Sequence, residues 1–356
     1  MEELAALVQA LLIILFVGGL SLLAQWSRKN QGAQISLIVI LLFVSFLVLA
    51  VGALVAIVGW SNTVSSDVPP GLVVGSAFTL VLAGLAGFAL CILPLRKITG
   101  HLKMVGYEGF APAESSPIEE RSFEGWWSDP PVFFALWMFV NTLAFSVVFL
   151  LGFAVEPEAV GSALSSTGRL SFFTVFVGQL PFVVIALCGV GLNVQRNFRE
   201  AVARLGYGPI TLPQLGIVAL FVVGALLLSY AADTLFATLQ PDLYDRVGQV
   251  SEVLFSPEGL SPVSAILFAL LIGVGAGVGE ETLFRGALQP RLGITLTSVL
   301  WASIHVQYGP SLLLIYIFVL SIGLGILRRR VNTTATFLAH AGYNSLGVLL
   351  AYFFGI

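Results

Sequence analysis

The chain has 356 residues, of which 58% are hydrophobic and only 10% are charged, and its formal net charge is −3. A soluble domain carries about 25% charged residues, so this composition excludes an ordinary soluble protein. Apolar runs of about 20 residues, the length that a helix needs to cross a bilayer, recur along the chain. We therefore expect an all-α, polytopic integral membrane protein whose surroundings are the lipid bilayer, and we expect no nucleic-acid partner.

We expect about ten membrane-spanning helices, taken in chain order. They lie near residues 4–25, 35–60, 71–95, 131–154, 171–194, 214–239, 262–288, 292–307, 310–328 and 333–355. The eighth and ninth are short and are separated only by Tyr308-Gly309-Pro310. The chain starts with Glu2-Glu3, and its first apolar run lacks a small-residue cleavage site. We expect that run to be a spanning helix and not a signal peptide.

Basic residues predict how the helices are oriented. Fourteen of the sixteen Lys and Arg residues fall in alternate connections: Arg28, Lys29, Arg96, Lys97, Lys103, Arg121, Arg196, Arg199, Arg204, Arg285, Arg291, Arg328, Arg329 and Arg330. The opposite connections hold only Arg169 and Arg246. Because cytoplasmic connections carry the excess of basic residues, both termini are expected outside the cytoplasm. The expected location is the plasma membrane.

The chain divides at its acidic segment, residues 240–261, into two membrane regions. Residues 1–240 are expected to form an accessory region with a cytoplasmic loop at 96–130, at whose end Ser128 or Asp129 can cap the next helix. Residues 262–350 form the second region. It opens with four alternate glycines from Gly273 to Gly279, whose small-x-x-x-small spacing predicts close helix packing.

Three polar clusters lie in this second region. They are Glu280-Glu281-Thr282-Leu283-Phe284-Arg285, Trp301-Ala302-Ser303-Ile304-His305 and His340-Ala341-Gly342-Tyr343-Asn344. An ionisable side chain at the bilayer centre costs about 2.5–3.5 kcal/mol or more. On a helix, Glu281 and Arg285 share a face and can neutralise each other, whereas Glu280 points about 100° away. Glu280 is thus left to face a cavity.

A simpler interpretation is structural. Glu281 and Arg285 can form a pair that only stabilises the helix, and a lone membrane His or Asn often bonds a neighbouring helix. The expected depth of these residues in the membrane argues against a purely structural interpretation. If the chain turns near residues 290–293, Glu280, His305 and His340 each lie roughly 15–18 Å into the membrane. Three helices would then bring them to one level that is open to the cytoplasm.

Such a group has two possible chemistries. A carboxylate beside a neutral imidazole can deprotonate a water molecule, while a second imidazole and an amide donate hydrogen bonds to an oxyanion. Alternatively, two histidines and a glutamate can bind Zn²⁺ with one open position for water. Both routes hydrolyse an amide, and the residues alone do not decide between them.

The motifs Glu-Glu-x-x-x-Arg, aromatic-x-x-x-His and His-x-x-x-Asn resemble those of the CPBP family, which includes type II CAAX prenyl endopeptidases and bacteriocin-processing or self-immunity membrane proteases. The resemblance implies that Glu280 activates water together with His305, and that His340 and Asn344 complete the site. It also implies supporting roles for Glu281 and Arg285. It leaves open whether Glu280, His305 and His340 bind zinc or whether the site works without a metal.

Two departures from the family pattern are present. Trp301 stands where Phe is commoner, and only 25 residues lead from Glu280 to His305. The resulting hypothesis is an intramembrane endopeptidase that cleaves a membrane-associated peptide or lipidated protein, prenylated or carrying a leader peptide. The alternatives are a non-catalytic immunity or scaffold protein and a proton-coupled transporter, whose intramembrane carboxylate and histidines would relay protons.

Overall fold

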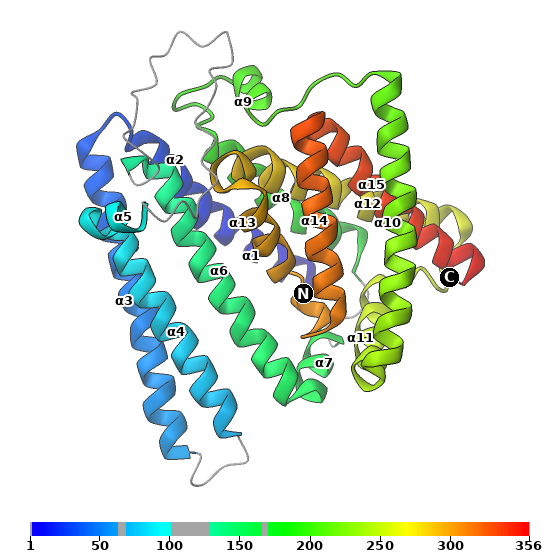
Figure 1. Cartoon of the computed structure of the whole chain (residues 1–356), viewed down its shortest axis with the longest axis horizontal. Helices are drawn as coiled ribbons and strands as arrows, with labels where there is room; N and C mark the ends of the chain where they lie inside the picture. Colours follow the sequence, from blue (N-terminus) through cyan, green and yellow to red (C-terminus); the bar gives the residue numbers. More distant parts are fainter. Residues whose placement is uncertain (1, 63–68, 101–127, 166–169, 356) are drawn as a thin grey trace.

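The computed structural model describes residues 2–62, 69–100, 128–165 and 170–355. These residues form helices and contain no β-strand, which confirms the all-α architecture (Figure 1). The first half contains α1 (Glu2–Ile13), η1 (Ile14–Gly18), α2 (Gly19–Trp26), α3 (Gln31–Asn62), α4 (Pro70–Cys91), α5 (Leu93–Gly100), α6 (Pro130–Val155), α7 (Pro157–Ser165) and α8 (Phe172–Gly189). The second half contains α9 (Phe198–Arg204), α10 (Leu212–Leu239), α11 (Pro241–Phe255), α12 (Pro262–Glu281), η3 (Thr282–Leu288), α13 (Gln289–Ser303), η4 (Val306–Tyr308), α14 (Leu312–Arg330) and α15 (Thr333–Phe354).

Within the described residues, nine helical runs are long and apolar enough to cross a membrane. The difference from the ten expected segments lies in the run from Pro262 to Ser303, which counts once although it contains two parts. Gly293 interrupts it with φ 77° and ψ 172°. A positive φ suits glycine because it has no Cβ. The break therefore falls within the turn expected at residues 290–293.

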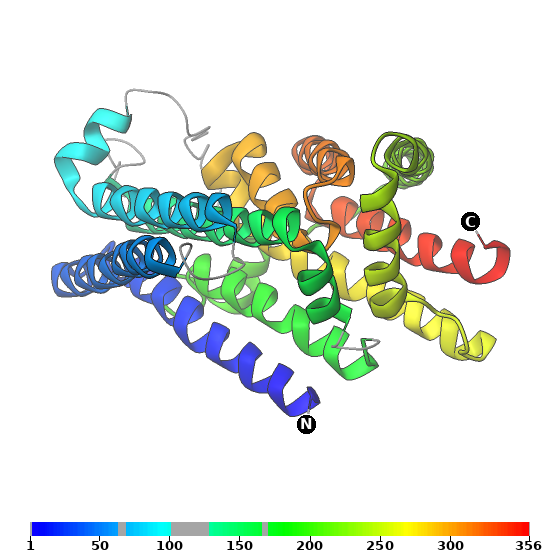
Figure 2. The same cartoon turned by 90° about the horizontal axis from the view of Figure 1, so that it is seen from below.

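The two ends of the chain build different parts of the bundle. Helices α3 and α4 lie side by side at one edge, and α6 connects them to the rest (Figures 1 and 2). The indole N–H of Trp137 in α6 donates to Ser45 Oγ of α3 at 2.9 Å. Helices α12 to α15 gather at the other end of the bundle, together with α8 and α10. All three polar clusters lie in this second group.

Helix α12 packs against α15 on one side and α8 on the other. A Cβ at Gly277 would lie 3.0 Å from Phe337 O and 3.2 Å from Ala341 Cβ, both in α15. A Cβ at Gly279 would lie 3.1 Å from Gln179 Cβ in α8. Positions two residues apart differ by about 200° on a helix, so the two helices cover opposite sides of α12. This confirms the close packing predicted from the glycine spacing.

The start of α6 differs from the expected capping. Asp129 occupies the N-cap position, but its side chain makes no capping hydrogen bond. Its carboxylate instead accepts two hydrogen bonds from Arg28, at 2.8 Å and 2.6 Å. A bidentate guanidinium is a stronger partner for a buried carboxylate than a backbone N–H, and it ties α6 to the end of α2. Most of the predicted loop 96–130, at residues 101–127, lies outside the described residues.

Candidate active site

Glu281 lies at the centre of a buried charge network. It is fully buried, and its carboxylate contacts Arg285 Nε at 3.3 Å and His340 Nδ1 at 3.0 Å. Arg285 is also fully buried and donates through Nη2 to Ser321 Oγ at 3.0 Å. The Glu281–Arg285 pair expected from helical phase is therefore present. The sequence did not predict that His340 from α15 would be its third member.

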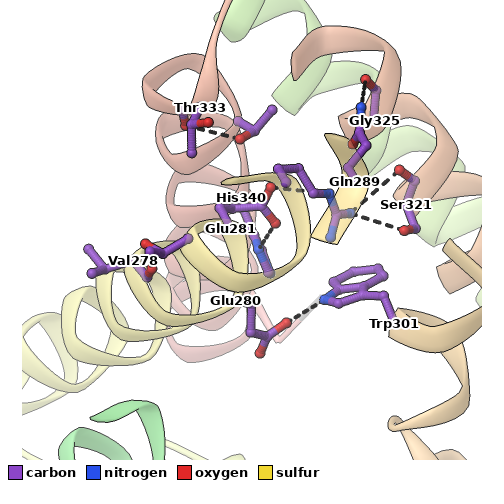
Figure 3. A network of polar contacts seen from close by, with 12 residues as sticks. Val278, Glu280, Glu281, Gln289, Trp301, Ser321, Gly325, Thr333 and His340 are labelled. Atoms are coloured by element: carbon purple, nitrogen blue, oxygen red, sulfur yellow. Dashed lines mark hydrogen bonds and ion pairs between the residues drawn. The ribbon is translucent and has the colours of Figure 1, made fainter. Parts of the chain in front are cut away.

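Glu280 points away from this network (Figure 3). It is partly exposed, and its Oε2 accepts a 2.6 Å hydrogen bond from the indole N–H of Trp301 in α13. The glutamates therefore differ as their helical phase predicts. Glu281 is enclosed by counter-charges, whereas Glu280 keeps one carboxylate oxygen, Oε1, for which no protein hydrogen bond is present among the described residues.

A π-helical turn follows the two glutamates. The hydroxyl of Thr282, its first residue, donates back to Val278 O and shares a 2.5 Å hydrogen bond with the Tyr207 hydroxyl. Beyond the turn, Gln289 Nε2 donates to Gly325 O of α14 at 2.9 Å. Turns of this kind are rare and are found frequently at functional sites. Here the turn carries Arg285, and neighbouring segments hold it at both ends.

His305 follows the end of α13. Its Nδ1 lies 2.7 Å from Trp301 O, and a carbonyl oxygen can only accept, so Nδ1 carries the hydrogen. In the neutral ring, Nε2 then has a free lone pair. The two rings also meet edge to face at 4.6 Å between centroids. Trp301 bonds Glu280 through its indole N–H and His305 through its carbonyl oxygen, so one residue holds both the carboxylate and the imidazole.

Trp301 links all of these side chains. It is 2% exposed, and besides bonding Glu280 it lies 5.5 Å from the ring of His340 and 4.8 Å from the guanidinium carbon of Arg285. A cation over an indole face is attracted to its π-electrons. The sequence identified Trp301 as the aromatic residue of the second motif but did not show that its N–H holds Glu280. Its position four residues before His305 was the available signal.

Asn344 lies one turn after His340 on α15. It is partly exposed, and its amide makes no hydrogen bond with the residues that the structure describes. His340 and Asn344 therefore share one face of α15, and the Asn344 carboxamide can still donate a hydrogen bond. This arrangement suits the binding of an oxyanion.

The residues do not form a ready-made metal site. In the described parts of the chain, no group of three or more His, Cys, Asp or Glu side chains is arranged to hold a metal ion. The Nδ1 atoms of His305 and His340 are engaged by Trp301 O and Glu281, respectively. Such second partners orient metal-binding and catalytic histidines alike. Metal binding by Glu280, His305 and His340 thus stays a prediction for experiment.

Comparison with protein-family models places a known domain over these clusters. Residues 262–346 match the family described as Type II CAAX prenyl endopeptidase Rce1-like. No curated protein matches the chain, and no solved structure does. The matched segment begins at the start of α12 and contains Glu280, Arg285, His305, His340 and Asn344. It confirms the family that the three motifs resemble. Residues 262–346 are thus similar to the Rce1-like type II CAAX prenyl endopeptidases, and they lie in a chain whose described residues include nine helical runs long and apolar enough to cross a membrane.

Proposed function

We propose that this protein is an intramembrane endopeptidase in which Glu280 activates the water that attacks the scissile carbonyl. The observation that carries the proposal is the contrast between the two glutamates. Glu281 is buried between Arg285 and His340, whereas Glu280 is partly exposed and is held by one donor, the indole of Trp301. A general base needs a fixed orientation and a free lone pair, and Glu280 has both.

The two histidines have different partners and therefore different roles. His305 bonds the neutral carbonyl of Trp301, so its ring works in the neutral form and accepts a hydrogen bond from the attacking water at Nε2. His340 is held by the carboxylate of Glu281 and lies one turn before Asn344 on α15. These two side chains are the candidates to bind the oxyanion.

These side chains can carry out each step of the hydrolysis. Glu280 removes a proton from water, the hydroxide oxygen bonds to the carbonyl carbon, and the negative charge moves to the carbonyl oxygen near His340 and Asn344. When the C–N bond breaks, Glu280 returns its proton to the leaving nitrogen. The carbonyl double bond re-forms as the C–N bond breaks, and the products are a carboxylic acid, which keeps the second proton of the water, and an amine. The substrate is a peptide or lipidated protein in the membrane, prenylated or carrying a leader peptide.

We further propose that the site opens to the cytoplasm and that the plasma membrane is the location. Five arginines lie at the connection formed by residues 189–206. Arg204 is part of it, Arg196 donates to Val190 O, Arg291 donates to Gly189 O, Arg28 donates to Gln195 Oε1, and a Cβ at Gly206 would collide with Arg328. Burial lowers the pKa of Arg204 well below its usual value, and the other four charges add to the effect. Such a concentration of basic residues is typical of the cytoplasmic side.

The test compares the wild-type protein with Glu280→Gln and with Glu252→Gln, an exposed glutamate in α11. The purified proteins are incubated in detergent with a peptide library that includes farnesylated peptides. Glu280→Gln should abolish cleavage without changing thermal unfolding, and Glu252→Gln should cleave normally. An inert wild-type protein would favour a non-catalytic immunity or scaffold function. Equal activity of all three would refute the role of Glu280.

The same cleavage assay tests whether the site needs a metal and which side of the membrane it faces. If a chelator stops Glu280-dependent cleavage and Zn²⁺ restores it, the site uses a metal. If the chelator has no effect on cleavage, the site works through the glutamate without a metal. A membrane-impermeant substrate peptide should be cleaved by inside-out vesicles and not by whole cells. Cleavage by whole cells alone would show that the site faces the other side.

A further inference from the structure

Helix α8, outside the segment that matches the family, runs alongside α12 and η3 in register. Phe172 meets Phe268 with 5.8 Å between ring centroids, and Phe182 meets Phe284 at 6.1 Å. Beyond these contacts, Arg291 Nη2 donates to Gly189 O at 2.8 Å. Because residue numbers rise together along both helices, they run parallel. Each turn of α8 therefore lies at the depth of a definable turn of α12.

Gln179 occupies the turn of α8 that lies against the catalytic turn of α12. Its side chain packs on two glycines: a Cβ at Gly275 would lie 3.4 Å from Gln179 Cγ, and one at Gly279 would lie 3.1 Å from Gln179 Cδ and would collide with Oε1. Gly279 directly precedes Glu280, whose side chain projects from α12 about 100° further round the same turn. The carboxamide and the candidate base are thus at one depth.

Gln179 is partly exposed, and its amide has no hydrogen-bond partner among the residues that the structure describes. Its Oε1 is buried and unbonded, and the described residues offer its side chain no other hydrogen bond. Apart from Thr174, Gln179 is the only residue of α8 with an amide or hydroxyl side chain. The Thr174 hydroxyl donates to Ser171 O at the start of the helix. Membrane amides usually bond a neighbouring helix, and burying one without a partner is unfavourable. Methionine would fill the same space without that penalty.

We propose that Gln179 binds the main chain of the substrate next to the scissile bond. A carboxamide has both a donor and an acceptor, so it can pair with the N–H and C=O groups of an extended peptide. Within the described residues no hydrogen bond holds it against Gly279, so the side chain can turn toward an incoming peptide without breaking a hydrogen bond. Gln179 would therefore contribute to substrate affinity, while Glu280 carries the chemistry. The inference rests on the proposed endopeptidase function.

The test uses Gln179→Met and Gln179→Leu with the peptide that the wild-type protein cleaves fastest. Loss of one neutral hydrogen bond made equally in the ground and transition states should raise KM about tenfold and change kcat less than about twofold. Thermal stability should stay equal or rise, because a buried unbonded oxygen is removed. Gln289→Met is the control for a structural amide: it loses the bond to Gly325 O and should lower thermal stability.

A second arm locates the contact. Peptides that carry one N-methylated amide at successive positions are compared on wild-type and Gln179→Met proteins. At one position near the cleaved bond, methylation should weaken wild-type cleavage but not that of the variant. If both Gln179 variants keep the wild-type KM, or if they lose stability as Gln289→Met does, Gln179 is a packing residue. That result overturns this inference alone, whereas activity that does not depend on Glu280 overturns the proposed function too.

Discussion

The buried pair of Glu281 and Arg285 makes a strong prediction about stability. Their side chains are 0% and 1% exposed, so neither charge can turn to water when its partner is removed. Leaving one member of a buried pair without its partner costs about 3–5 kcal/mol. We therefore expect Glu281→Gln and Arg285→Met each to lower the free energy of unfolding by about this amount. The double variant should lose less than the sum, because no charge is left alone.

The structure adds detail to this expectation. The 3.3 Å contact between Arg285 Nε and Glu281 Oε2 lacks hydrogen-bond geometry, so the pair is held mainly by charge. His340 offers Glu281 a second partner. Among the described residues, Arg285 has only the hydrogen bonds to Ser321 beyond its ion pair and its contact with the Trp301 ring. Glu281→Gln strands a cation that cannot be neutralised. It should thus be the more destabilising of the two changes.

Equilibrium unfolding in mixed detergent, followed by circular dichroism of the helices, measures all three variants. The control is Glu158→Gln, which removes an exposed pair with Arg246 at 3.8 Å and should change the free energy by less than about 1 kcal/mol. Single variants that match this control would show that the buried pair is not a stabilising unit. A double variant that equals the sum of the singles would show that the two charges act independently.

Two further changes test the site and its packing. Trp301→Phe removes the donor to Glu280 and should lower kcat by roughly one to two orders of magnitude, the value of a hydrogen bond to a charged group; unchanged turnover would mean that Glu280 is oriented by other contacts. Gly277→Ala places a methyl group 3.0 Å from Phe337 O and should cost about 1–3 kcal/mol of stability. Gly224→Ala in α10, where nothing lies within 4 Å, should not destabilise, and equal losses from both would contradict the packing argument.

The sequence was sufficient for features that depend on periodicity within one helix. The Glu281–Arg285 pair and the packing of Gly273 to Gly279 follow from the 3.6-residue repeat, and the spans follow from the length of the apolar runs. The same repeat does not show which helix covers a given face. For that reason the bond between Glu281 and His340, which are 59 positions apart, was not predicted. Arg285 was also assigned to a basic connection, but the structure shows it fully buried.

The sequence also did not predict where the structure departs from a local helix pattern, such as capping or the regular repeat. Asp129 follows the sequence pattern of a helix cap, yet it binds Arg28, 101 positions away. The π-helical turn after Glu281 departs from the repeat that the sequence argument assumed. At Asp129 a charged partner from another segment replaces the local capping hydrogen bond. Such partners are brought together only by the folded chain.

The packing of α12 explains why two adjacent glutamates have different surroundings. Its glycines admit α15 on the side of Gly277 and α8 on the side of Gly279, so both helices approach more closely than larger residues allow. The close approach of α15 brings His340 onto Glu281. Glu280, one residue on, falls between the two contact faces and meets Trp301 instead. A larger residue at Gly277 would move α15 outward and separate His340 from Glu281. We therefore regard the glycine spacing as a condition for the candidate site and not only for helix packing.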